Sequence, residues 1–211
     1  QVPTADVINM SLGGNSYSAI YEEAITLAQL AGSSVVAAAG NSGVNTVMYP
    51  AAYAGVIGVS ATDLTGELTV YSNYGDEIDV TAPGGDTRFD LDGDLYVDGV
   101  LSLAWDVFNN HPYFQFLQGT SMAAPHVSAV AALMKSVNPD LDPASVTFLL
   151  RSSARDIGIP GPDTFYGWGM VDAAAAVELA REVSTARFSE VIVRLRSVST
   201  VVGTDYACAS G

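Results

Sequence analysis

The sequence predicts an α/β domain with a mainly parallel central sheet. Short runs of β-branched and small apolar residues alternate with longer stretches whose apolar residues recur at helical spacing. The chain has 211 residues, of which 49% are hydrophobic, so it is long enough to bury one sizeable core. This alternation is typical of parallel strands joined by crossover helices, and it favours one layered domain over two.

The first half of the chain contains three expected strands and one expected helix. Residues 6–12 form a β-rich run, and residues 18–32 carry apolar residues at helical spacing, with Gly32 suited to the C-terminal end of that helix. Two further apolar runs, 33–40 and 55–62, are typical of strands buried on both faces.

Three more helices are expected in the second half. They should begin at Ser121, at the Asp142-Pro143 pair and near Asp172. The aspartate of the Asp-Pro pair can cap the helix, and the proline is favourable as its first residue.

Two segments interrupt the alternation of strands and helices. Residues 85–105 are polar and acidic and are expected to form an inserted loop. Residues 183–211 differ again in style, and we expect a tail, a linker or the start of a C-terminal extension there.

Charge excludes some classes of partner. The chain has 8 basic and 23 acidic residues, a net charge of -15, which repels phosphate backbones and anionic lipid headgroups. Nucleic acid is therefore not an expected partner. Charged and small polar residues interrupt every apolar stretch before the roughly 18 residues that a membrane helix needs, so no membrane span is expected.

The stretch "GTSMAAPHV", residues 119–127, places hydroxyl groups at the start of an apolar helix. A serine at a strand-to-helix corner can act as a nucleophile, because the helix N-terminus favours developing negative charge and the small neighbours admit a substrate. The alternative is a helix N-cap followed by a core helix, which needs only one hydroxyl. Ser121 is thus a candidate catalytic residue.

Two other short motifs follow predicted strands. In "AAAGNSG", residues 37–43, the Asn41 amide can donate a hydrogen bond to an oxyanion, although Asn and Gly are also common turn residues. In "SLGG", residues 11–14, an extended peptide could add to the sheet edge, although the motif can also be a plain strand end.

Together these motifs resemble the subtilisin-like serine proteases. The blocks "VINMSLGG", "VVAAAGNSG" and "GTSMAAPHV" stand in this order, and "DVTAPGG" and "YGWGMVDAAAAV" extend the similarity over roughly residues 5 to 180. The resemblance implies a three-layer α/β sandwich with a mainly parallel central sheet. It also implies a secreted endopeptidase that hydrolyses polypeptide substrates through an acyl-enzyme, with residues 1–182 as the C-terminal portion of its catalytic domain.

The resemblance also assigns roles to individual residues. Ser121 would be the nucleophile, and Asn41 would be the side-chain donor to the oxyanion. Met48 would reach the floor of the primary specificity pocket and limit its depth. The residues that would bind the substrate backbone and form the pocket walls are Ser11, Leu12, Gly13, Gly14, Ala38, Ala39 and Gly40.

Neither histidine is suited to act as the base for Ser121. His126 follows it by five residues on the same helix, which rotates it about 140° away, and we expect it to lie in the core or behind the site. His111 is expected in a surface loop. The family order Asp, His, Ser then implies that both missing residues lie in an N-terminal part absent from this chain.

Other functions stay open at this point. A protease-like module that binds peptides without catalysis is the alternative, and a degenerate upstream segment would support it. An α/β-hydrolase is disfavoured because its Gly-x-Ser-x-Gly elbow is replaced by Gly-Thr-Ser-Met-Ala.

The acidic segment contains a candidate structural calcium loop, "DLDGDLYVDG". Alternate carboxylates and one backbone carbonyl could converge on a hard cation. Leu95 replaces the usual turn glycine and Leu101 the usual bidentate glutamate, so a solvated acidic turn is an equal alternative. The candidate ligands are Asp90, Asp92, Asp94, Tyr96 and Asp98.

Overall fold

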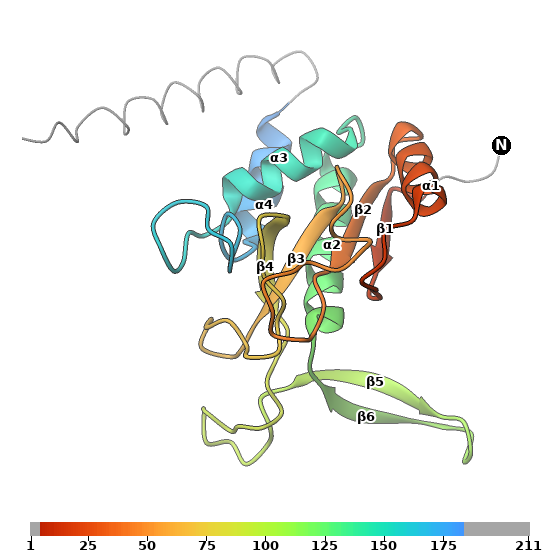
Figure 1. The fold of residues 1–211 in the computed structure, drawn as a ribbon. Helices are drawn as coiled ribbons and strands as arrows, with labels where there is room; N and C mark the ends of the chain where they lie inside the picture. Colours follow the sequence, from red (N-terminus) through yellow and green to blue (C-terminus); the bar gives the residue numbers. More distant parts are fainter. Residues whose placement is uncertain (1–4, 184–211) are drawn as a thin grey trace, which may run out of the picture.

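The computed structural model describes residues 5–183, which form a four-stranded parallel sheet between helices (Figure 1). The strands are β1 (Val7–Met10), β2 (Ser34–Ala38), β3 (Ile57–Thr62) and β4 (Ile78–Pro83), and they lie side by side in chain order. Every pairing in this sheet is parallel. The predicted strands are confirmed, and β4 was not predicted.

Helices cover both faces of the sheet. Helix α1 (Ala19–Leu30) lies on one face, and α2 (Thr120–Val137), α3 (Pro143–Ser153) and α4 (Ala173–Glu182) lie on the other. All four helices were predicted. Ser18, Asp142 and Asp172 cap α1, α3 and α4 through side-chain oxygens that accept backbone N–H groups.

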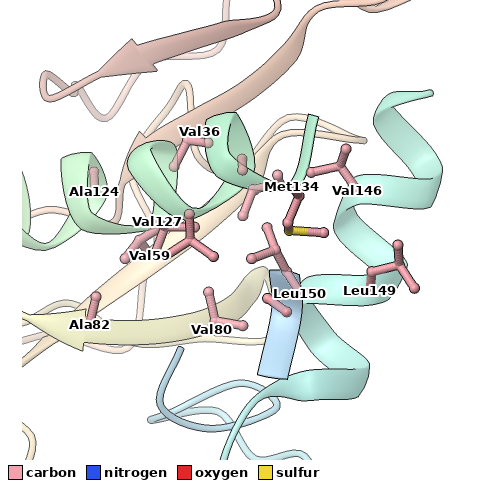
Figure 2. Packing of buried hydrophobic residues seen from close by; sticks show 14 of the residues in the cluster. Val36, Val59, Val80, Ala82, Ala124, Val127, Met134, Val146, Leu149 and Leu150 are labelled. Atoms are coloured by element: carbon pink, nitrogen blue, oxygen red, sulfur yellow. The ribbon is translucent and has the colours of Figure 1, made fainter. Parts of the chain in front are cut away.

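The larger core lies between the sheet and the helices α2, α3 and α4 (Figure 2). Successive residues of β2 point to opposite faces, so Val36 packs toward α2 while Val35 packs toward α1. Helix α2 is nearly all small or apolar on its sheet side, which lets it lie close against all four strands. Residues of this core seen in Figure 2 include Val59, Val80, Val127, Met134, Leu149 and Leu150.

The expected inserted loop is shorter than predicted. Residues 100 to 105, placed in that loop, instead belong to β5 (Val100–Asp106), which pairs with β6 (His111–Leu117) as an antiparallel hairpin. The acidic composition ends at Gly99, and beyond it apolar residues alternate with others, which favours strand pairing. His111 accordingly begins β6 rather than lying in a loop, although it is exposed as expected.

The C-terminal boundary also shifts slightly. Val183 was assigned to the tail, but it is buried in the main core at 1% exposure. The rest of the expected tail, residues 184–211, lies outside the described residues. Among residues 5–183, no helix has the length and apolar character needed to cross a membrane.

A buried ion pair joins β4 to α3. The Asp79 side chain is 3% exposed, and its carboxylate accepts hydrogen bonds from Gly58 N (2.7 Å) and Arg151 Nε (2.6 Å). Burial raises the pKa of Asp79, while Arg151 and the Gly58 N–H oppose that rise by favouring the charged form. A folded-state pKa above the unfolded value means that the cost of this ionised group falls as the pH is lowered.

We predict that Arg151→Met lowers the free energy of unfolding by about 2–3 kcal/mol at neutral pH, because it leaves a buried carboxylate without its cation. Half of the Arg151 side chain is in water, which holds the loss toward the low end of such effects. The loss should shrink as the pH is lowered through the raised pKa of Asp79, because protonation removes the buried charge that Arg151 compensates. Urea unfolding at several pH values measures both quantities.

Arg181→Met is the matched control, since Arg181 is 61% exposed and lies 3.9 Å from Glu178 on the surface of α4. It should change stability by less than about 0.5 kcal/mol. An equal loss in the two variants, or a loss in Arg151→Met that does not depend on pH, would contradict the assignment.

Candidate active site

The predicted catalytic residues meet at the carboxyl edge of the parallel sheet. β1 runs into Ser11, β2 runs into Asn41, and α2 returns to the same edge with Ser121 as its second residue. Loops after neighbouring parallel strands converge at this edge, which is where ligands bind in open α/β sheets. The structure thus brings together three motifs that are far apart in the sequence.

Ser121 is fixed to the end of β1 by two reciprocal contacts. Its Oγ lies 3.4 Å from the carbonyl oxygen of Ser11, and Ser11 Oγ donates to the carbonyl oxygen of Ser121 at 2.8 Å. Ser121 is half-buried at the N-terminus of an 18-residue helix. Its hydroxyl therefore stands at a helix end that stabilises negative charge.

The N-cap interpretation of these hydroxyls is wrong. Gly119 occupies the N-cap position and offers no side chain, while the Thr120 and Ser121 hydroxyls bond elsewhere. Gly119 has φ +143°, a backbone conformation that glycine tolerates best. Neither hydroxyl group is therefore needed to cap the N-terminus of α2.

The Asn41 amide is held in one orientation. Its Oδ1 accepts from Thr120 N at 2.9 Å and from Thr120 Oγ1 at 2.8 Å, and Gly40 N donates to the same threonine hydroxyl at 3.2 Å. Two donors on one amide atom identify that atom as the oxygen. Asn41 is exposed, so Nδ2 can donate outward.

A second donor lies near Asn41 Nδ2. The Thr120 N–H donates to Asn41 Oδ1, and the Met122 N–H donates to the Gly119 carbonyl oxygen. The Ser121 N–H, in contrast, has no partner among the described residues. A Cβ built on Gly119 would lie 3.3 Å from Asn41 Nδ2 and 3.6 Å from Ser121 N. The space that Gly119 leaves open is therefore flanked by two N–H donors, the arrangement that stabilises an oxyanion.

Neither histidine contacts Ser121. Of the two places predicted for His126, the core is excluded, because the residue is exposed and its Nδ1 donates to the Met122 carbonyl oxygen at 2.7 Å. A position behind the site stays a prediction. Five residues of helix turn it away from the serine, toward the side of α2 that faces solvent here. His111 lies on the hairpin, with its Nε2 3.9 Å from Asp106 Oδ2.

The predicted substrate-binding residues divide into two groups. Residues 11–14 lie mostly exposed, and Gly14 forms a two-way backbone bridge with Tyr49 (2.8 and 3.0 Å). Ala38 and Ala39 are 3% and 0% exposed, and their methyl groups belong to the two cores. Any contact of Ala38 or Ala39 with a peptide would have to come from the backbone.

Met48 lies between the two predicted pocket walls. Its Sδ is 3.5 Å from a Cβ built on Gly13 and 2.8 Å from one built on Gly40. The thioether therefore occupies space between the backbones of the two glycines. A Cβ on Gly40 would collide with the thioether and with Asn73 Nδ2 (2.5 Å), whereas a Cβ on Gly13 would only be crowded, at 3.1 Å from Met48 Cβ.

Three residues of the site were not singled out from the sequence. Asn9 donates to Ser11 Oγ at 3.0 Å, and Ser128 on α2 donates to Asn9 Oδ1 at 2.9 Å. Buried Asn73 accepts from Ser42 N and donates to the Thr46 carbonyl oxygen, which holds the loop after Asn41. A polar Asn inside the apolar β1 run was the one sequence signal for any of them.

The acidic loop brings only part of the predicted metal set together. Carboxylate oxygens of Asp90, Asp92 and Asp98 lie within 4.8 Å of one another. Asp94 is not among these three carboxylates, and its Oδ1 instead accepts from Tyr96 N at 2.8 Å. The backbone carbonyl of Tyr96 stays a predicted ligand. Asp90 also accepts from Gly93 N at 2.8 Å, which folds the loop back on itself.

Sequence comparisons connect this site to characterised proteins. A model of the subtilase family, Peptidase S8, matches residues 3–169. The chain is 38% identical over 172 residues to a thermostable alkaline protease from Halalkalibacterium halodurans, covering 82% of this chain and 42% of that protein. It is 37% identical over 170 residues to subtilisin BL from Lederbergia lenta, covering 81% and 55%. The chain thus spans about half the length of these relatives.

Solved structures agree with the sequence comparisons. A protease from Pseudoalteromonas arctica superposes with a TM-score of 0.74 at 44% identity, over 83% of this chain and 51% of the other. Fervidolysin from Fervidobacterium pennivorans, described as a keratinolytic enzyme related to subtilisin, gives 0.69 at 32% identity, over 82% and 26%. The predicted three-layer α/β fold with a parallel central sheet is confirmed by these neighbours.

Proposed function

The chain belongs to the subtilase family, and from this premise we propose that it carries the nucleophile and oxyanion site of a serine endopeptidase. Ser121 Oγ attacks the scissile carbonyl carbon and passes its proton to a histidine base. The oxyanion that forms accepts hydrogen bonds from Asn41 Nδ2 and Ser121 N. The amine leaves with the proton from the histidine, and water then releases the acyl group from Ser121.

The orientation of the Asn41 amide is the observation that carries this proposal. Thr120 occupies Asn41 Oδ1 with two hydrogen bonds, so the amide NH₂ is directed away from α2 before any substrate arrives. A donor that is already oriented requires no rearrangement as charge develops in the transition state. A plain turn asparagine would not need this support.

The catalytic histidine and aspartate are proposed to come from a further segment of the protein that docks beside β1. β1 has only one sheet neighbour, β2, among the described residues. A groove of about 320 Å³ lies beside it, lined by Ile8, Met10, Tyr21, Ala24, Ile25, Ala28 and Val35. An open edge strand flanked by apolar residues is suited to receive another strand.

The second candidate function is a peptide-binding module without catalysis. It is favoured by one observation, which is that Ser121 Oγ has the Ser11 carbonyl oxygen as its partner and no base beside it among residues 5–183. The substrate backbone would still bind to residues 11–14 by strand addition.

Polypeptides with small residues at the cleavage position are the proposed substrates. Met48 fills the space between Gly13 and Gly40, so the primary pocket is shallow. We also propose that the protein is exported and cleaves these polypeptides outside the cell.

A fluorophosphonate probe distinguishes the two functions. We predict that Ser121 is labelled in a protein extended at the N-terminus and labelled at most feebly in the 211-residue chain, because the nucleophile needs its base. Mass spectrometry locates the label, and Ser136→Ala, which changes an exposed serine of the same helix, serves as the control that keeps Ser121. Absence of label from an extended, folded protein would favour the binding module.

We predict that Asn41→Leu lowers kcat of the extended enzyme while leaving KM nearly unchanged, because Asn41 acts mainly on the transition state. Removal of the equivalent donor in subtilisin costs about 10²–10³ in kcat, and we adopt that magnitude. Asn45→Leu, an exposed change in the same loop, is the control. A large rise in KM with kcat intact would show that Asn41 binds the ground state instead.

We predict that Met48→Ala enlarges the pocket and shifts preference from small to large apolar residues at the cleavage position. One methylene group in an apolar pocket is worth about 1–3 kcal/mol, or about 10–200-fold in relative kcat/KM, so we expect a shift of at least about tenfold. Paired peptides that differ only at this position, Ala against Phe, measure the ratio. An unchanged ratio would mean that Met48 does not form the floor.

We also propose that Asp90, Asp92 and Asp98 hold a structural calcium ion. Three converging carboxylates are the hard oxygen donors that calcium prefers. The ion would offset the mutual repulsion of these groups in a chain of net charge -15.

The expected result is a rise in Tm on adding calcium that is absent in Asp92→Asn. Ligand binding stabilises by mass action, about 2.7 kcal/mol at a hundredfold excess over Kd. Asp140→Asn, an exposed change outside the loop, should keep the full rise. Equal behaviour of the two variants, or no rise in the unsubstituted chain, would leave the loop as a solvated acidic turn.

A further inference from the structure

The β5–β6 hairpin has one apolar face and one polar face. Directly paired residues of an antiparallel hairpin share a face, and the faces alternate along each strand. Three alternate pairs on one face are apolar on both strands. The opposite face, called the polar face, carries the pairs Ser102 with Gln115, Ala104 with Tyr113 and Asp106 with His111, together with the apolar pair Val100 with Leu117 at the start of the hairpin. We call the apolar face the apolar strip; its residues are Leu101, Phe116, Leu103, Phe114, Trp105 and Pro112.

The apolar strip lies in water over most of its length. Leu103, Trp105 and Phe114 are 64%, 55% and 74% exposed, and the hairpin extends away from the sheet and helices (Figure 1). At the end nearest the sheet Phe116 is partly covered by Tyr96, with ring centroids 5.9 Å apart, while its partner Leu101 is 53% exposed. A contiguous exposed patch of large apolar side chains is typical of an interaction surface.

The strip is continuous with the active-site segment. β6 ends at Leu117, and only Gln118 separates it from Gly119 at the mouth of the oxyanion site. Gln118 is itself fixed, since its Oε1 accepts from Thr87 N and Thr87 Oγ1 at 2.6 and 2.8 Å. A substrate peptide that is bound at Ser121 and extends from there toward Gln118 would therefore lie along the hairpin, whose position is fixed by these hydrogen bonds.

Charge and spacing define the chemistry of the occupant. Between residues 100 and 117 the acidic and basic side chains are Asp106 and His111, and both lie on the polar face. Side chains on one face of a strand repeat every two residues, about 6.6–6.8 Å, which is also the repeat of an extended peptide. The strip thus matches alternate apolar side chains of an extended polypeptide.

We propose that the apolar strip binds apolar segments of the polypeptide substrate outside the cleavage position. This inference rests on the proposed protease function, because it takes the substrate to be held at Ser121. It makes the hairpin an exosite that selects extended, hydrophobic stretches such as those exposed in unfolded proteins. A short peptide held only near Ser121 does not reach it.

The first test measures binding without catalysis, in the Ser121→Ala variant. Trp105 reports from the strip once Trp168 is replaced by Phe. The probe is an extended peptide with Leu and Phe at alternate positions, compared with one that has Ser at those positions. The Leu/Phe peptide should shift Trp105 emission to shorter wavelength and the Ser peptide should not.

Variants of adjacent hairpin pairs provide the matched control. Leu103→Ser/Phe114→Ser removes the central pair of the strip, and Ala104→Ser/Tyr113→Ser changes the next pair on the polar face. The first should weaken binding of the Leu/Phe peptide about tenfold or more, and the second should change it less than about twofold. If the hairpin does not fold in the first variant, the difference in binding between the Leu/Phe peptide and the Ser peptide to the unsubstituted hairpin still tests the proposal.

In the active, extended enzyme, Leu103→Ser/Phe114→Ser should lower kcat/KM about tenfold for the long Leu/Phe substrate and leave a short chromogenic peptide unchanged. Equal binding of the two peptides would overturn the proposal. So would a Trp105 that is already protected from acrylamide in the extended protein, or a strip closed by self-association in sedimentation. Failure of serine labelling with a retained Trp105 shift would refute the protease but not binding by the strip.

Discussion

The site depends on the hydrogen bonds by which Thr120 holds Asn41. Through them the start of α2 is joined to the end of β2, and Gly40 N completes the connection by donating to the threonine hydroxyl. These bonds use the first amide of α2 and the amide oxygen of Asn41. What they leave over, the Ser121 N–H and Asn41 Nδ2, faces the space beside Gly119. One small network thus holds the start of α2 and directs the two N–H donors that are proposed to stabilise an oxyanion.

A second set of contacts places the same helix from the other side. Gly119 N donates to the Gly84 carbonyl oxygen at 3.0 Å and to Tyr71 Oη at 3.0 Å, and Tyr71 Oη donates to the Gly85 carbonyl oxygen at 2.6 Å. A Cβ on Gly84 would lie 2.9 Å from the Gly119 carbonyl oxygen, so the two backbones approach too closely for a side chain. β4, the acidic loop and the hairpin are therefore anchored at one point next to Ser121.

Much of the fold could be predicted from the sequence because burial on both faces leaves a strong local pattern. The residues 33–40 and 55–62 read as strands since a parallel sheet between helices selects apolar residues at every position. Strand β4 was not predicted because Asp79 and Thr81 interrupt its apolar run. Asp79 is tolerated there because Arg151 pairs with its carboxylate, whereas the buried Thr81 hydroxyl has no hydrogen-bond partner among the described residues. The β5–β6 hairpin was not predicted because the local sequence of a strand does not show which other strand it pairs with.

The candidate site was partly predictable for a related reason. Ser121 and Asn41 stand in short motifs that keep their neighbours in sequence, whereas Asn9, Asn73 and Ser128 act across large sequence separations and have no motif of their own. The burial of Ala38 and the solvent-exposed side of α2 that carries His126 depend on what packs beside them, which sequence spacing does not report.

The apolar strip of the hairpin differs from the rest of this acidic chain because it carries no charged side chain. A chain with net charge -15 repels acidic polypeptides and attracts basic ones, so this field alone would make the proposed recognition of polypeptides depend on their charge. The hairpin beside Ser121 removes charge from one face and exposes aromatic and aliphatic side chains there. Burial of apolar area is insensitive to salt, unlike attraction between exposed charges. Recognition along the apolar strip would therefore persist at ionic strengths that suppress charge selection.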